Sequence, residues 1–414
     1  MTWKDSFAPL RERGFAWYYA GRLVSLAGSM MAPIALAFAV LGITDNSASA
    51  LGYVLAARTT PLVLFLLYGG VLADRLSRAV VIQASNVLAG LTQAVVAYLF
   101  ISGTADLWMV IVLEAINGTV SAFAFPAMNS IVPQLAPRTH LRQANALLSF
   151  SRGGMSIIGP AVAALLVETA GAGWAIGIDA ATWLMAAGCM SRVRLPARDR
   201  SGEATNGMLR ELREGWAVFA GTTWLWVVVL AFGALNAILA GAWLTLGPAV
   251  ADGTFGAAGW GTILSAESFG LLLMTIVMLR VGFRFPLRAG MLGMCCMSVP
   301  MLILGVHPSV VPLTVAAFVS GAGLEVFSIG WSLAMQEHIA EEMLSRAYSY
   351  DALGSFVAMP VGQVVYGPLG QALGYRPVLI VSAVVFLGVC LLTLTSRAVR
   401  RLERVPAPIA EPVS

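Results

Sequence analysis

The chain has 414 residues, of which 58% are hydrophobic and only 11% are charged, and its mean hydropathy is +0.82. Soluble domains carry roughly 25% charged residues, so this composition excludes a soluble globule of the same size. The net charge of +4 comes from basic residues in short connections, and we therefore expect no nucleic-acid partner. The composition predicts an all-α membrane protein whose surroundings are the lipid bilayer.

About twelve apolar segments follow one another along the chain. Each is long enough to cross a hydrocarbon core of ~30 Å. The first is longer than the apolar part of a signal peptide, and we expect it to be retained as a span. The predicted spans are residues 15–42, 50–70, 79–102, 106–129, 143–168, 172–191, 222–249, 257–279, 287–306, 309–335, 345–370 and 374–396.

The basic residues indicate how these spans are oriented. They are concentrated in both tails and in alternate connections, whereas the connections on the opposite side contain only Arg376. Short loops rich in Arg and Lys remain in the cytoplasm. Both termini are therefore predicted to be cytoplasmic. This requires an even number of spans and favours twelve over eleven or thirteen.

A polar interruption near the middle divides the chain into two halves. It runs from about Arg192 to Thr223 and contains a segment, Met208–Phe219, in which apolar residues recur at helical spacing. Such a segment is typical of an amphipathic helix on a membrane surface. We predict a six-helix bundle over residues 1–191, a cytoplasmic linker over 192–221, a second six-helix bundle over 222–398 and a cytoplasmic tail over 399–414.

A short charged sequence separates the second and third predicted spans. Gly70, Asp74, Arg75 and Arg78 stand here at the spacing of the signature loop of major facilitator superfamily transporters, although Ser77 and Ala79 replace a Gly and a basic residue of that pattern. The chain resembles that superfamily, and its drug and siderophore exporter branch in particular, through residues 21–28 and 144–146. The resemblance implies two bundles with the substrate site between them.

The resemblance also implies a gating role for this loop. A carboxylate can stabilise the positive end of a helix dipole, and Asp74 is a candidate to cap the helix that starts near Arg346. The corresponding connection of the second half has basic residues but no acid. The capping contact between the two halves, which we call the latch, would therefore depend on Asp74 alone. The alternative is a solvated loop that only sets the topology.

Eight ionisable residues fall inside predicted spans. Each costs roughly 2.5–3.5 kcal/mol at the bilayer centre, so we expect these side chains to face a wet cavity or one another. From their depths, Arg58 and Glu114 share a level in the outer half, and Arg152 and Glu267 lie near the middle. The set, which we propose for coupling or substrate binding, is Arg22, Arg58, Glu114, Arg152, Asp179, Glu267, Glu325 and Asp351.

The roles of these acids stay open at this level. Glu114 and Glu267 are candidates for binding a proton or a cationic substrate, with structural pairing as the alternative. Asp179 lies on a span that is peripheral in the superfamily fold and, like Glu325, is assigned a structural role. In proton-driven exporters of the superfamily an Arg often occupies the position of Glu114, so that motif is altered here.

Small residues and aromatic residues mark other candidate positions. Gly154, Gly159 and Pro160 in the fifth span are expected to allow close helix packing and to kink the helix, or to form part of an antiporter motif. Five aromatic residues are expected either to line an apolar pocket or to pack in the core or against lipid. They are Phe123, Phe150, Trp243, Trp260 and Trp331.

Several kinds of chemistry are excluded by what the sequence lacks. Lys4 is the only lysine, so no Walker A loop can be formed, and the three histidines have no metal-binding spacing. We expect no enzymatic activity, no cofactor and no metal ion. The four cysteines lie in apolar runs and are expected to be buried thiols.

The function that fits best is secondary active transport. We predict a monomeric exporter of small amphipathic compounds in the bacterial plasma membrane, driven by proton antiport. A facilitator or importer on the same fold is the first alternative, and a non-transporting membrane sensor is a remote one.

Overall fold

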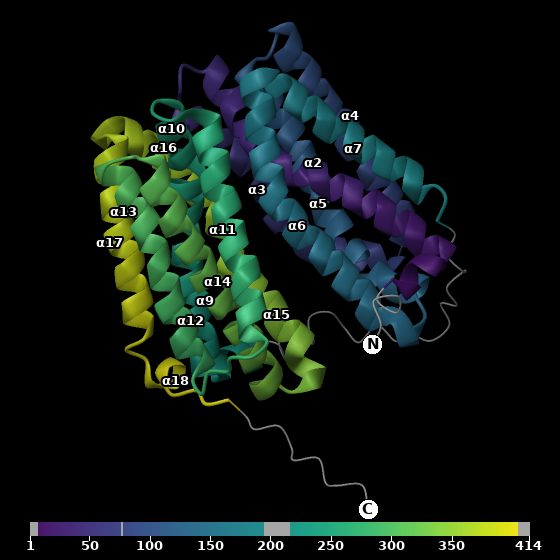
Figure 1. Cartoon of the computed structure of the whole chain (residues 1–414). Helices are drawn as coiled ribbons and strands as arrows, with labels where there is room; N and C mark the ends of the chain where they lie inside the picture. Colours follow the sequence, from purple (N-terminus) through teal and green to yellow (C-terminus); the bar gives the residue numbers. More distant parts are fainter. Residues whose placement is uncertain (1–6, 76–77, 194–215, 405–414) are drawn as a thin grey trace, which may run out of the picture.

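The computed structural model describes residues 7–75, 78–193 and 216–404, and these ranges contain helices and no strand (Figure 1). A bilayer core offers no hydrogen-bond partner to the backbone. Helices satisfy their N–H and C=O groups internally, which is why long apolar segments take this form.

The first group of long helices contains six members. They begin and end within a few residues of the first six predicted spans, except that two of them extend further at their C-terminal ends. The helices are α2 (Arg13–Ile43), α3 (Ala48–Arg75), α4 (Arg78–Ser102), α5 (Leu107–Leu135), α6 (Leu141–Thr169) and α7 (Ala172–Met190).

The second group follows residue 216 and contains more breaks. Its helical segments cover the remaining six predicted spans. They are α9 (Thr223–Ile238), the π-helix η3 (Leu239–Leu246), α10 (Gly247–Asp252), α11 (Gly256–Met278), α12 (Pro286–Met294), η4 (Cys295–Met297), α13 (Ser298–Val306), α14 (Val310–His338), α15 (Glu341–Phe356), α16 (Met359–Leu373), α17 (Tyr375–Thr393) and α18 (Arg397–Arg400).

Eleven helices of the described chain are long and apolar enough to cross a membrane. The helix α7, which was predicted to be the sixth span, is not among them. It has 19 residues, as many as α17, which is among them, but its residues include Asp179 and three glycines, which lower its hydropathy. It nevertheless packs lengthwise against α2 and α4.

Prolines account for the breaks within the second group. A proline cannot donate a backbone hydrogen bond, and its ring clashes with the carbonyl four residues earlier. Pro360 thus explains why α15 ends at Phe356, and Pro300 accounts for the tight turn η4. The predicted eleventh span is therefore two helices, and it begins at Glu341 rather than near Arg346.

The two groups pack chiefly within themselves. Helices α6 and α11 make the largest contact between the groups, and α3 and α16 make the next largest. The short helix α18 lies at the lower end of the molecule in Figure 1. We call this the proximal end, and we call the opposite end, which holds the turn between α2 and α3, the distal end.

The charged sequence between the second and third spans differs from the expected loop. The helix α3 continues through Gly70 and Asp74 and ends only at Arg75, while α4 begins at Arg78. Only two residues separate these helices. The side chains of Asp74 and Arg75 lie outside the described part of the structure, as do residues 194–215, which include most of the expected amphipathic linker helix.

The described end of the linker docks on the second group. The ring of Trp216 lies 5.6 Å from that of Phe219, and both rings lie 5.7 Å from the ring of Tyr350 on α15. Offset and tilted aromatic contacts at these distances are favourable. The linker is thereby fixed to the proximal part of α15.

Candidate functional site

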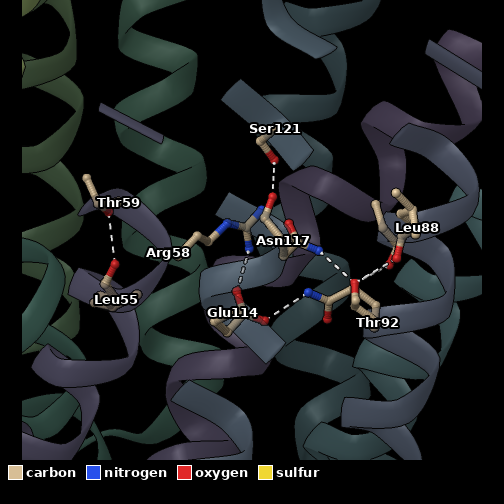
Figure 2. Close-up of polar contacts among 10 residues, drawn as sticks. Leu55, Arg58, Thr59, Leu88, Thr92, Glu114, Asn117 and Ser121 are labelled. Carbon is tan, nitrogen blue, oxygen red and sulfur yellow. Dashed lines mark hydrogen bonds and ion pairs between the residues drawn. The ribbon is translucent and has the colours of Figure 1, made fainter. Parts of the chain in front are cut away.

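An ion pair within the first group joins α3 to α5. Nη1 of Arg58 lies 3.4 Å from Oε2 of Glu114, whose side chain is 0% exposed (Figure 2). The amide of Gln93 on α4 donates to the other carboxylate oxygen at 2.9 Å. The contact predicted from the depths of the two charged residues is thus present, and each carboxylate oxygen has a donor.

The close approach of two backbones positions this pair. A Cβ atom added at Gly118 would lie 2.8 Å from the carbonyl carbon of Arg58, so only glycine lets α5 pack so tightly on α3. Hydrogen bonds continue along α5, where Ser121 donates to the carbonyl of Asn117 and Asn117 donates to Thr92 of α4 (Figure 2).

Asp179 lies deeper than its predicted peripheral position implied. Its side chain is 1% exposed and faces the interior of the group, because α7 packs against both α2 and α4. A Cβ atom at Gly28 of α2 would lie 2.5 Å from its Oδ1. Within the described chain, this Oδ1 atom has no hydrogen-bond partner.

Three acids of the second group accept hydrogen bonds from neighbouring helices. The indole of Trp243, on the π-helix, donates to Glu267 of α11 at 3.2 Å, and the indole of Trp331 donates to Asp351 at 3.0 Å. Thr275 donates to Glu325 at 2.8 Å. Such pairings were not predicted because the sequence does not show which donors face these acids.

The expected pair between Arg152 and Glu267 is absent. A Cβ atom at Gly261 would lie 2.6 Å from the carbonyl oxygen of Pro160, so that side of α11 lies on α6. Glu267 is six residues further along, a rotation of about 240° at 3.6 residues per turn. Its carboxylate therefore points into the second group, toward Trp243, and away from Arg152.

Arg152 instead faces a polar cavity within the first group. This cavity has a volume of about 130 Å³ and lies between α2, α5 and α6. Arg22 lines it from α2, and Asn145 and Ser149 line it beside Arg152 on α6.

Hydrogen bonds join the two groups at the distal end. The amide of Asn46 donates to the carbonyl of Ala249 at 3.1 Å, and Tyr375 donates to the carbonyl of Asn46 at 3.4 Å. Ser49 donates to Gln371 at 2.9 Å, and Gln371 donates to Ser47 at 3.1 Å.

We call these four hydrogen bonds the distal seam. Asn46 can make its contacts because its φ of +60° places it in the left-handed region, which asparagine tolerates better than most residues. A further bond near the same end joins the backbone N–H of Ala258 to Glu168 at 2.9 Å.

The small residues of α6 have different surroundings. A Cβ atom at Gly159 would lie 2.5 Å from Cβ of Met30, so this glycine permits contact with α2 as expected. A Cβ atom added at Gly154, in contrast, would have no atom of another element within 4 Å, and the expectation of close packing there is wrong. Pro160 lies inside α6, which continues past it to Thr169.

The five aromatic candidates have different surroundings. Trp243 and Trp260 are each 2% exposed and pack with their rings 4.8 Å apart, whereas Phe150 is 74% exposed. In the described ranges, no group of three His, Cys, Asp or Glu side chains is placed to hold a metal ion.

Relatives and solved structures identify the fold and the class of protein. The chain matches the transmembrane secretion effector family over residues 4–408. It is 23% identical to macrolide efflux protein A of Streptococcus pyogenes over 400 residues, which cover 94% of this chain and 97% of that protein. It is 25% identical to the enterobactin exporter EntS of Escherichia coli over 362 residues, which cover 83% of this chain and 82% of that protein.

Solved structures agree on the fold. The nucleoside transporter NupG superposes with a TM-score of 0.75 at 13% identity and covers 92% of this chain and 98% of its own. A bacterial homologue of the lysosomal transporter Spinster, in an inward-facing occupied conformation, has a TM-score of 0.72 at 13% identity, with 96% and 99% covered.

These matches agree with the resemblance inferred from Gly70–Arg78. The relatives are membrane transporters rather than enzymes, and they come from bacteria. The chain belongs to the transmembrane secretion effector family of the major facilitator superfamily and is a multi-pass transporter of the bacterial cell membrane.

Proposed function

We propose that this chain exports small amphipathic compounds by alternating access, driven by the inward movement of protons. Two of its relatives, the macrolide efflux protein and the enterobactin exporter, are exporters. In this proposal both termini are cytoplasmic, α7 crosses the membrane as the sixth of twelve spans, and the two six-helix bundles of one monomer rock about their interface. The distal seam is then the outer gate, which is closed in this structure.

The observation that carries proton coupling is the environment of Glu267. Glu114 is held by a cation and an amide, whereas Glu267 is only partly buried and accepts a single hydrogen bond, from Trp243. A carboxyl group with no cation beside it can gain and lose a proton without breaking an ion pair. Glu325 has a similar environment, with one hydrogen bond from Thr275. We assign proton exchange to Glu267 because its donor, Trp243, lies on the segment that leads to the outer gate.

The segment that carries Trp243 connects Glu267 to the outer gate. Trp243 lies on the π-helix η3, which runs directly into α10, and Ala249 of α10 accepts the hydrogen bond from Asn46. π-Helical turns frequently occur at functional sites. A hydrogen bond to a charged acceptor is roughly twice as strong as a neutral one, so protonation of Glu267 weakens its hold on Trp243. The gate segment then moves more freely.

The charged residues at the connection of α3 and α4 supply the second gate of this proposal, at the proximal end. Asp74 and Arg75 would latch the first bundle to the proximal end of α15 when the proximal end closes, as the resemblance to the superfamily implies. Asp74→Asn is the corresponding gating variant. The latch has an acid in the first half alone, since the matching connection of the second half has none.

The available energy is sufficient for efflux. One charge that moves through ~100 mV provides about 2.3 kcal/mol. At about 1.4 kcal/mol for each factor of ten, one proton supports an outward substrate gradient of a few tens-fold. No nucleotide is needed.

Glu267→Gln is expected to abolish concentrative transport while leaving exchange intact. The amide keeps the size of the side chain and can still accept the indole N–H, but it cannot carry a proton. In proteoliposomes loaded with a cationic dye such as rhodamine 123, wild-type protein should respond to an imposed pH gradient. The variant should show dye counterflow that ignores the gradient.

Glu325→Gln is the matched control for this experiment. Glu325 is also an acid of the second group that accepts one hydrogen bond from a neighbouring helix. We expect this variant to keep its response to the gradient. If wild-type transport ignores the gradient, the protein is a facilitator. If Glu325→Gln loses the response and Glu267→Gln keeps it, Glu267 is not the coupling acid.

A further inference from the structure

The polar cavity of the first group contains two guanidinium groups that face the same space. Arg22 reaches it from α2 and Arg152 from α6. Neither makes a side-chain hydrogen bond or an ion pair with any residue in the described part of the chain. Both therefore direct charged donors into the cavity instead of into the protein.

The cavity wall supplies no negative charge. Its other described lining residues include the polar Tyr18, Asn145 and Ser149 and no Asp or Glu. The charges of Arg22 and Arg152 act unfavourably on each other across this space. An unpaired charge inside a bilayer costs roughly 2.5–3.5 kcal/mol, and two that repel each other cost more. This arrangement is stable only if water or an anion compensates it.

The spacing of the polar lining residues places them on one face of each helix. Tyr18 and Arg22 are four residues apart on α2, and Asn145, Ser149 and Arg152 are four and three residues apart on α6. Residues at these intervals lie on one face of a helix. Two helices thus turn hydrogen-bonding faces toward each other, with both cations at a similar depth.

The third wall of the cavity is apolar. It is formed by Met128 and Val132 of α5. The volume of about 130 Å³ corresponds to roughly four water molecules at ~30 Å³ each. The cavity can therefore hold a head group beside an apolar surface.

We propose that this cavity binds the anionic group of those exported compounds that carry one, a carboxylate, sulfonate or phosphate attached to an apolar body. The proposal rests on the export function above and adds a class of substrate to it. Guanidinium groups bind such oxyanions through two parallel hydrogen bonds, and two of them on different helices fix the orientation of the anion.

Equilibrium binding of two dyes of opposite charge tests the proposal. The purified protein is placed in nanodiscs of phosphatidylcholine, and the anisotropy of fluorescein, an anion, is compared with that of rhodamine 123, a cation on a similar ring system. We expect saturable fluorescein binding that weakens roughly tenfold or more in Arg22→Gln and in Arg152→Gln, since each loses a hydrogen bond to a charged group. Rhodamine 123 binding should not change.

Three further variants separate charge from folding. Arg142→Gln removes an exposed cation from the same helix, outside the cavity, and should leave fluorescein binding unchanged. Arg22→Lys and Arg152→Lys keep the charge but lose the paired hydrogen bonds, and should retain part of the binding that the glutamine variants lose. If fluorescein binds equally well to the wild type and to both glutamine variants, or does not bind at all, the proposal is overturned.

A second nanodisc composition identifies the source of the anion. If phosphatidylglycerol competes with fluorescein in the wild type but not in Arg152→Gln, the cavity takes a lipid head group and the assignment to substrate fails. No competition supports a solute. Binding needs no gradient, so the two proposals can fail separately. If the wild type binds no fluorescein but still carries out proton-driven transport of rhodamine 123, this inference alone is rejected. If the wild type binds fluorescein but its transport ignores the pH gradient, proton coupling alone is rejected.

Discussion

Replacing Arg58 with methionine is expected to destabilise the protein by about 3 kcal/mol. Breaking a buried ion pair by removing one partner leaves an uncompensated charge, which typically costs 3–5 kcal/mol. Glu114 is 0% exposed and would retain only the amide of Gln93 as a donor. We choose the lower value because the side chain of Arg58 is itself 30% exposed. Thermal unfolding of the purified variant in detergent measures the loss.

The double variant Arg58→Met/Glu114→Gln is the control. It removes both charges, and the new amide can still accept the hydrogen bond from Gln93. Replacement of a whole buried ion pair by neutral groups of similar volume is often close to neutral. We therefore expect the double variant to recover most of the stability that Arg58→Met loses. If the double variant loses as much stability as the sum of the losses of its two single substitutions, the ion pair of Arg58 and Glu114 does not stabilise the fold.

The positions of the helices could be predicted from the sequence because bilayer thickness sets the length of an apolar run. All twelve predicted segments fall on helices. The internal breaks could not be predicted in the same way. Pro360 ends α15, yet Pro33 and Pro160 lie inside continuous helices, since the effect of a proline depends on how neighbouring helices satisfy the freed carbonyl.

The candidate site was only partly predictable, because sequence gives depth better than direction. Arg58 and Glu114 share a level and meet, whereas Arg152 and Glu267 were placed at one level and point to opposite sides of a helix contact. The rise per residue fixes the level of a side chain. Its direction depends on the rotation of the whole helix, which packing sets.

The same limit hid the neutral partners of the acids. Gln93 and Trp243 are 21 and 24 residues away from the acids to which they donate. Neither spacing marks a contact. Trp243 was considered as a pocket-lining residue or as one packed in the core or against lipid, not as a hydrogen-bond donor, and its position on a π-helical turn has no signature in the local sequence.

Gly52→Val is expected to open the distal end and to abolish transport. A Cβ atom at Gly52 of α3 would collide with the backbone carbonyl oxygen of Gln363 on α16, across the contact between the two groups. A backbone carbonyl cannot turn aside as a side chain can. Overpacking of this kind costs about 1–3 kcal/mol. Because the cost arises only when the distal end is closed, it shifts the balance toward the distal-open state by roughly 5- to 150-fold.

The shift can be measured by labelling Ala48→Cys with a membrane-impermeant maleimide, after the four native cysteines are replaced. Ala48 is 0% exposed beside the distal seam, so labelling reports the opening of that end. Gly42→Val is the matched control, because Gly42 is also a helical glycine near the distal end but has nothing within 4 Å. We expect fast labelling and no transport in Gly52→Val, and slow labelling and normal transport in Gly42→Val. Equal labelling of the two variants would show that the contact of α3 with α16 is not a gate, and the assignment of the distal seam to alternating access would fail with it.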